Sequence, residues 1–252
     1  MTPDARRAAL DSIAKEVRVC QRCRLATGRK QAVPGEGHPD TEVVFVGEGP
    51  GQREDEQGRP FVGAAGTFLE ELLALVEWRR EDVFITNVVK CRPPGNRDPE
   101  PDEMAACRPY LELQLAALDP ALVVTLGRFS LQTFMPGARI SQTHGTERPV
   151  DPATGAPAAH AYAMYHPAAA LRQHALRETM MRDMASIPEA LLRARAQREG
   201  REERQDMPDR APAAIEVHSA DASPEGLHMP APPLVPMSAS GEEAADDQLG
   251  LF

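Results

Sequence analysis

The sequence has no apolar run long enough to cross a membrane, and charged side chains fill residues 1–19, where a signal peptide would have its apolar core. We therefore expect a cytoplasmic protein without membrane contact. It has only four cysteines, and in that compartment they are not expected to form disulfides. An excess of positive charge is also missing, because the formal net charge is -10. This counts mildly against nucleic acid as a partner.

The negative charge is concentrated near the end of the chain. Residues 198–252 carry four basic and twelve acidic side chains, together with seven prolines and no strong periodicity. This composition is typical of a disordered segment. Residues 1–197 are close to neutral and long enough to bury a core. We expect one domain over 1–197, a disordered acidic, proline-rich tail over 198–252, and a monomer by default.

Four short apolar segments alternate with helical patterns in residues 1–197. Strands are expected at 42–46, 83–87, 121–126 and 161–165. Helices are expected at 4–19, 65–77, 102–118, 129–134 and 169–196. The strands are rich in Val and Ile and apolar on both faces, which predicts a four-stranded parallel sheet covered by helices on each side.

Polar residues or glycine follow each predicted strand. Glu48, Asn87, Gly127 and His166 all lie within a residue or two of a strand end. Ligands of open parallel sheets bind beyond the carboxyl ends of the strands. The sequence therefore predicts that Glu48, Asn87 and His166 surround one crevice.

The segment 47–66 is predicted to be a long loop between a strand and a helix. It has six glycines and two prolines, so its backbone can approach a flat ligand closely. A phosphate loop is the alternative. No Lys-Ser/Thr pair follows the glycines, however, and the acidic residues Glu48, Glu54, Asp55 and Glu56 would repel a phosphate.

The four cysteines are Cys20, Cys23, Cys91 and Cys107. A Cys-x-x-Cys pair with two further cysteines fits ligation of a metal by four thiolates. The spacing alone leaves both a structural zinc ion and a 4Fe-4S cluster open.

Three motifs resemble those of the iron-sulfur, family-four (type A) uracil-DNA glycosylases of bacteria. They are the whole of 47–66, with its Gly-Glu-Gly-Pro-Gly start and Pro-Phe-Val-Gly core, then 87–94 and 165–169. The resemblance extends from about Val19 to about Leu192. It implies a doubly wound α/β/α sandwich around a four-stranded parallel sheet, and a 4Fe-4S cluster on the four cysteines.

The resemblance also implies the activity. A monofunctional glycosylase of this family hydrolyses the N-glycosidic bond of deoxyuridine in single- and double-stranded DNA. It releases uracil and leaves an abasic site for base excision repair. Uracil-containing DNA would be the partner, and the location would be the nucleoid. Substrate contacts are expected from Gly47, Glu48, Gly49, Glu54, Phe61, Asn87 and His166.

Phe61 resembles the family residue that stacks on uracil, and its alternative role is an ordinary core residue. The Asn87 amide offers a donor and an acceptor that match O4 and N3-H of uracil, whereas a turn residue is the alternative. His166 resembles the family histidine that donates to uracil O2, and its alternative role is a helix cap.

Glu48 is our candidate for stabilising the sugar cation or orienting water, with Glu54 and Asp55 as competitors. Glu54 is also a candidate for excluding the methyl group of thymine. On the DNA side, Leu171 is the expected wedge into the vacated base stack, with Arg172 beside it. Arg92, Arg97 and Arg108 are expected either to contact phosphates or to form surface ion pairs.

The last five residues, Gln248-Leu249-Gly250-Leu251-Phe252, resemble the peptide that binds the bacterial sliding clamp. Gln248, Leu249, Leu251 and Phe252 are the expected contacts, and the tail would tether the enzyme to newly made DNA.

Two other functions remain open from the sequence. One is a catalytically inactive iron-sulfur accessory protein that binds DNA, although the presence of Glu48, Asn87 and His166 together argues against it. The other is a nucleotide hydrolase using the same crevice, which activity on free deoxyuridine would favour.

Overall fold

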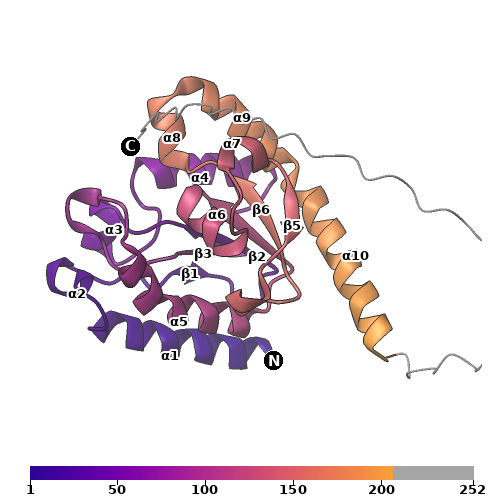
Figure 1. Ribbon diagram of the computed structural model, residues 1–252, viewed down its shortest axis with the longest axis horizontal. Helices are drawn as coiled ribbons and strands as arrows, with labels where there is room; N and C mark the ends of the chain where they lie inside the picture. Colours follow the sequence, from indigo (N-terminus) through magenta and orange to yellow (C-terminus); the bar gives the residue numbers. More distant parts are fainter. Residues whose placement is uncertain (207–252) are drawn as a thin grey trace, which may run out of the picture. The chain divides into compact units, whose positions relative to one another are not determined.

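The computed structural model describes residues 1–206, and these contain one sheet of six strands (Figure 1). The strand order is β1-β3-β2-β4-β6-β5. The strands are β1 (Glu36–Gly37), β2 (Val43–Gly47), β3 (Phe84–Asn87), β4 (Leu122–Leu126), β5 (Glu147–Pro149) and β6 (His160–Met164). The central four, β3, β2, β4 and β6, are parallel, as predicted. Two short antiparallel edge strands, β1 and β5, extend this predicted sheet.

Helices cover both faces of the sheet (Figure 1). One face is covered by α1 (Pro3–Val19), α5 (Pro101–Leu118) and α6 (Arg128–Phe134). The opposite face is covered by α4 (Ala64–Leu75), α8 (Pro167–Arg172), α9 (His174–Ala185) and α10 (Ile187–Asp206). Shorter helices are α2 (Leu25–Gly28), α3 (Gln52–Gln57) and α7 (Ile140–Thr143). This arrangement is the predicted doubly wound α/β/α sandwich.

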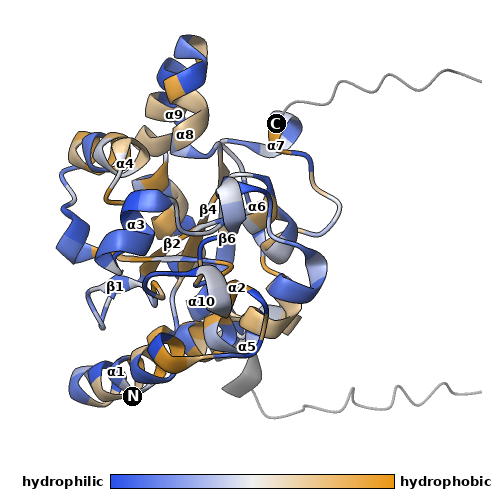
Figure 2. Cartoon of the chain, turned by 90° about the vertical axis from the view of Figure 1, so that its left-hand side faces the viewer, coloured by the Kyte–Doolittle hydropathy of each residue, from blue (hydrophilic) through white to orange (hydrophobic). Residues whose placement is uncertain are grey.

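The strands divide their side chains between two apolar layers, because successive residues of a strand point to opposite faces. In β2, Val44 and Val46 belong to the layer with α1 and α5, whereas Val43 and Phe45 belong to the layer with α4. Figure 2 shows β2 as hydrophobic in the middle of the molecule and α3 as hydrophilic outside it. Burial on both faces explains why the four central strands are so evenly apolar.

The segment predicted as a long loop, 47–66, contains the helix α3. Its six residues include no glycine, and glycines bound the helix on each side. Gly51 is the N-cap, and Gly58 ends the helix in the left-handed conformation with φ 69°. The high glycine content of the whole segment led to the prediction of a loop. The structure instead has a short helix, and two of the glycines mark its ends.

The predicted final helix at 169–196 is wrong as a single element, because three helices occupy this region. Gln173 is extended between α8 and α9, and Ser186 separates α9 from α10. Pro188 lies at the start of α10, where its missing N–H has no helical acceptor. The predicted domain boundary at residue 197 falls inside α10, which continues to Asp206.

No helix within residues 1–206 is long and apolar enough to cross a membrane. The carboxyl ends of β2, β3, β4 and β6 lie at one edge of the sheet, because these strands are parallel and in register. The residues that follow these ends form the candidate site.

Candidate active site

Gly47, Asn87 and Phe61 meet at the carboxyl ends of β2 and β3. Gly47 pairs with Asn87 across the two strands. A Cβ atom on Gly47 would lie 2.4 Å from Asn87 Oδ1 and 2.6 Å from Phe61 Cζ. Only glycine at this position allows the amide and the ring to approach the same point. Three of the predicted substrate residues therefore meet at one place, which is the candidate substrate site.

The Asn87 side chain is buried without a partner for its acceptor. The residue is 1% exposed, and Oδ1 has no hydrogen-bond partner in the described part of the chain. A buried polar atom without a partner costs about 1 to 3 kcal/mol. The N–H of a ligand that enters this site would offset that cost. Asn87 is the end of β3, as predicted, but its side chain has no turn-forming role among these contacts.

Phe61 is held in an unusual conformation beside His166. The two ring centroids are 5.6 Å apart with an interplanar angle of 29°. The φ angle of Phe61 is +51°, a value rare for aromatic residues. The Arg80 guanidinium donates to the Phe61 carbonyl at 2.8 Å, and a Cβ on Gly66 would overlap that carbonyl at 1.8 Å. Arg80 and Gly66 thus fix where the Phe61 ring points.

His166 caps the N-terminus of α8, as its predicted alternative role required. Its Nδ1 accepts a hydrogen bond from the Ala168 backbone N–H at 3.1 Å. In the neutral ring Nε2 then carries the proton and is a donor. The pKa of His166 is lowered to about 4, mainly by burial; the negative charge of Glu54 opposes this shift, and the positive charge of Arg172 contributes to it. The cap fixes the tautomer, so capping and donation to a ligand are compatible.

Glu48 follows β2 and is half-buried. The pKa of its carboxyl group is raised to about 7, mainly by burial and also by the negative charge of Asp98. The positive charge of Arg128 acts in the opposite direction. Glu48 can therefore exchange a proton near neutral pH, which suits a residue that works in either protonation state.

The two competing carboxylates have structural partners in α3. Glu54 Oε1 accepts hydrogen bonds from the backbone N–H groups of Val62 and Gly63, both at 2.9 Å. Asp55 is 2% exposed, and its Oδ1 accepts from the Lys30 backbone N–H at 2.9 Å. These bonds secure the segment that carries Phe61. Glu48 forms no such bond among the described residues, so the structure favours it over Asp55 and Glu54 for contact with water or sugar.

Gly49 and the expected DNA contacts lie at the same edge. A Cβ on Gly49 would lie 2.7 Å from Val89 Cγ2, so a side chain there would displace the segment after β3. Leu171 is on α8, the helix that His166 begins, and is 50% exposed. Its role as a wedge stays a prediction, as does the DNA contact of Arg172. Of the arginines with two predicted roles, Arg97 and Arg108 form ion pairs with Glu103 and Glu112.

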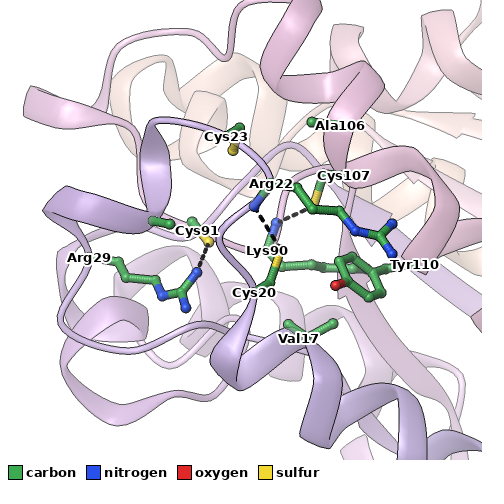
Figure 3. A pocket seen from close by; sticks show the side chains of 11 residues that line it. Val17, Cys20, Arg22, Cys23, Arg29, Lys90, Cys91, Ala106, Cys107 and Tyr110 are labelled. Atoms are coloured by element: carbon green, nitrogen blue, oxygen red, sulfur yellow. Dashed lines mark hydrogen bonds between the residues drawn. The ribbon is translucent and has the colours of Figure 1, made fainter.

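The four cysteines line one small pocket between the end of α1, α5 and the segment after β3 (Figure 3). Their sulfurs are free, and three of them accept hydrogen bonds. Arg29 donates to Cys91 at 3.1 Å, and the backbone N–H groups of Arg22 and Lys90 donate to Cys20 at 3.4 Å and Cys107 at 3.2 Å. Such donors stabilise thiolates.

Two further properties of this cysteine pocket concern metal binding. Within residues 1–206, no three His, Cys, Asp or Glu side chains are placed to hold a single metal ion. Burial raises the pKa of Cys107 to about 11 and also raises the pKa of Cys91. Four free thiols that line one pocket are a donor set that would fit a metal ion or a metal cluster.

The model of the uracil DNA glycosylase superfamily matches residues 34–186. This match spans the sheet, the candidate substrate residues from Gly47 to His166, and the two later cysteines. The chain belongs to the uracil DNA glycosylase superfamily.

Curated members of the superfamily are similar over most of their length. The type-4 uracil-DNA glycosylase of Saccharolobus solfataricus is 45% identical, over 72% of this chain and 86% of its own. That of Archaeoglobus fulgidus is 45% identical over 72% and 92%. A bacterial relative, the type-4 enzyme of Thermotoga maritima, is 48% identical over 56% and 74%.

Sequence reasoning about this superfamily member missed Arg80, Asp98 and the role of Lys90. Arg80 and Asp98 act from segments that no motif marks. Lys90 lies inside the motif at 87–94, but the sequence gives no sign that its side chain is buried. Gln248, Leu249, Leu251 and Phe252 lie outside the described residues, so the expected clamp contacts stay predictions.

Proposed function

We propose that this protein is a monofunctional uracil-DNA glycosylase. It hydrolyses the N-glycosidic bond of deoxyuridine in single- and double-stranded DNA, releases uracil and leaves an abasic site for base excision repair. One observation carries the proposal. Asn87, a buried amide with an unpartnered acceptor, lies against Gly47, and the Phe61 ring lies against the same glycine.

Asn87 and Phe61 supply recognition of the base. A uracil turned out of the stack would lie against the Phe61 ring, with its N3-H donating to Asn87 Oδ1 and its O4 accepting from the amide nitrogen. Cytosine has an acceptor at N3 and an amino group at C4, which reverse both polarities. Each mismatched polar contact would cost about 1 to 3 kcal/mol, so cytosine would be rejected.

His166 and Glu48 supply the chemistry. Breaking the glycosidic bond leaves negative charge on uracil O2 and positive charge on the deoxyribose. The Nε2–H of neutral His166 would donate to O2, and a preorganised donor of this kind is worth about 3 to 4 kcal/mol. The Glu48 carboxylate would stabilise the sugar cation and orient the attacking water.

We also propose that Cys20, Cys23, Cys91 and Cys107 hold a 4Fe-4S cluster. When bound, the cluster would cross-link the end of α1, α5 and the segment after β3. The hydrogen bonds from Arg29, Arg22 and Lys90 to three sulfurs support this assignment, because they stabilise the ligands as thiolates. Four iron atoms per chain in the purified protein would agree with a cluster, and stoichiometric zinc would contradict it.

The test of the activity is cleavage of a labelled oligonucleotide that contains one uracil, followed by alkali to break the strand at abasic sites. The wild type should cleave, and His166→Ala should be about 100- to 1,000-fold slower. A wild type that binds this DNA without releasing uracil would instead indicate an iron-sulfur accessory protein. Release from free deoxyuridine, with none from DNA, would indicate a nucleotide hydrolase.

A further inference from the structure

Lys90 is a fully buried lysine with three hydrogen-bond acceptors around its ammonium group. The residue is 1% exposed. Its Nζ donates to Thr86 Oγ1 at 2.5 Å, to Gln114 Oε1 at 2.7 Å and to the backbone carbonyl of Asn87 at 2.8 Å. A buried lysine is costly unless its donors are satisfied, and here all three are used.

The backbone of Lys90 belongs to the cysteine pocket, whereas its ammonium group contacts the backbone carbonyl of Asn87. Its N–H donates to Cys107 Sγ at 3.2 Å, and Lys90 lines the cysteine pocket (Figure 3). Its carbonyl accepts from the Val33 N–H at 2.7 Å. Hydrogen bonds therefore hold both backbone groups of Lys90, and they fix the position from which its side chain extends.

The turn between Asn87 and Lys90 is held from two sides. The N–H groups of Val88 and Val89 donate to the carbonyls of Gly47 and Glu48, at 2.9 and 3.1 Å. The bond from Lys90 Nζ to the Asn87 carbonyl holds the peptide plane directly after Asn87. That plane includes the carbonyl carbon bonded to Asn87 Cα, so holding it restrains the backbone from which the Asn87 side chain leaves.

We infer that Lys90 is a positioning residue, which holds Asn87 in the orientation that recognises uracil. This inference rests on the proposed function. Lys90 does not reach the base itself, because its three donors are occupied by Thr86, Gln114 and the Asn87 carbonyl. Its contribution is exerted through Asn87, and a lysine that only filled the core would not depend on that side chain.

The experiment measures single-turnover release of uracil by Lys90→Met, which preserves the length of the side chain and removes the donors. The backbone N–H to Cys107 is unchanged by this substitution. We expect a loss of about 10- to 100-fold in uracil release. Lys15→Met, on the exposed face of α1, is the matched control and should equal the wild type. Iron content and affinity for DNA with a tetrahydrofuran abasic site should stay at wild-type values, because neither involves the Asn87 amide.

A double-mutant cycle with Asn87→Ala separates positioning from stability. Because Lys90 acts through Asn87, Lys90→Met should cost less than about 3-fold when Asn87 is already alanine. The milder variant Thr86→Val, which removes one acceptor of Lys90, should show a smaller loss with the same dependence. Thr86→Val replaces Lys90→Met in the double-mutant cycle if Lys90→Met does not fold.

Equal losses in both backgrounds would overturn the inference, and so would a parallel loss of iron or of abasic-site affinity. In either case the wild type would still release uracil, so the proposed function would stand. A wild type that releases no uracil would remove the proposed function and, with it, the role of Lys90.

Discussion

At the scale of single residues, the pKa values of Glu48 and His166 are shifted in opposite directions. Burial keeps His166 neutral down to a pKa of about 4, whereas burial and Asp98 raise the pKa of Glu48 to about 7. Opposite shifts of this kind suit the separate proposed roles of donor and carboxylate. Above pH 5, only Glu48 of these two should change protonation with pH.

We predict an acidic limb near pH 7 in the pH profile of kcat/KM. In the proposed reaction Glu48 acts as a carboxylate, so activity should rise as it loses its proton. Asp98 raises the pKa of Glu48, and Asp98→Asn should therefore move the limb to lower pH. The measurement is initial rate on uracil-containing DNA from pH 5 to pH 9, with Asp11→Asn on α1 as the control. A limb that stays in place or moves upward would refute the assignment of Glu48.

The sequence predicts the candidate site residues better than it predicts the residues that hold them in place or shift their pKa values. Glu48, Asn87 and His166 follow strand ends, and parallel strands bring such ends to one edge. Arg80 donates a hydrogen bond to the Phe61 carbonyl, and the charge of Asp98 raises the pKa of Glu48. Both residues lie far along the chain from the residues that they affect. No local pattern encodes these contacts, because they depend on how loops pack after the sheet has formed.

At the scale of elements, α3 and the segment after it behave as a braced unit. Glu54 joins α3 to the Val62 and Gly63 backbone, and Asp55 joins it to the backbone of Lys30. Arg80 secures the far end through the carbonyls of Pro60 and Phe61. The brace maintains a positive φ at Phe61 that an isolated loop would not keep.

We predict that Arg80→Met lowers kcat/KM for uracil release by about 10-fold, because the Phe61 carbonyl loses its donor. The loss should be small in a Phe61→Ala background, where no ring remains to be positioned. Arg79→Met is the neighbouring control, since Arg79 is largely exposed and pairs with Glu81 and Asp82. The same loss with and without the Phe61 ring would show that Arg80 only stabilises the fold.

The four central strands lie within one or two residues of their predicted bounds, because each is a short apolar run that ends at a polar residue or glycine. The helices are less well predicted. The predicted loop at 47–66 contains α3. The apolar pattern at 169–196 predicts one helix, but Gln173 and Ser186 divide the region into three. Periodicity shows which face is buried, but it does not show where tertiary contacts turn the axis of a helix.

At the scale of the whole molecule, the residues proposed to bind uracil or act on it all lie within residues 1–206, and the superfamily match ends at residue 186. We propose that residues 207–252 serve as a tether that ends in a clamp-binding peptide.

A chain that ends at Asp206 should therefore release uracil from a short oligonucleotide within about twofold of the full-length rate. Deleting only Gln248–Phe252 should abolish capture by a purified bacterial sliding clamp, because the apolar side chains that enter its pocket are lost. Replacement of the same five residues by Gly-Ser repeats should have the same effect. Unchanged capture by the deleted chain would contradict a clamp-binding peptide.

The two short edge strands have a consequence for the behaviour of the protein at high concentration. An open sheet exposes unpaired backbone groups at its edges, which can template the pairing of further chains. Here β1 contributes only two residues, and β5 contributes three, of which Glu147 and Arg148 are charged and Pro149 lacks an N–H. Edge-to-edge aggregation is thereby discouraged on both sides of the sheet. Without β1 and β5, the longer strands β3 and β6 would form the edges of the sheet. Concentrated solutions of this protein should stay free of fibrils under conditions in which a sheet with those exposed edges would polymerise.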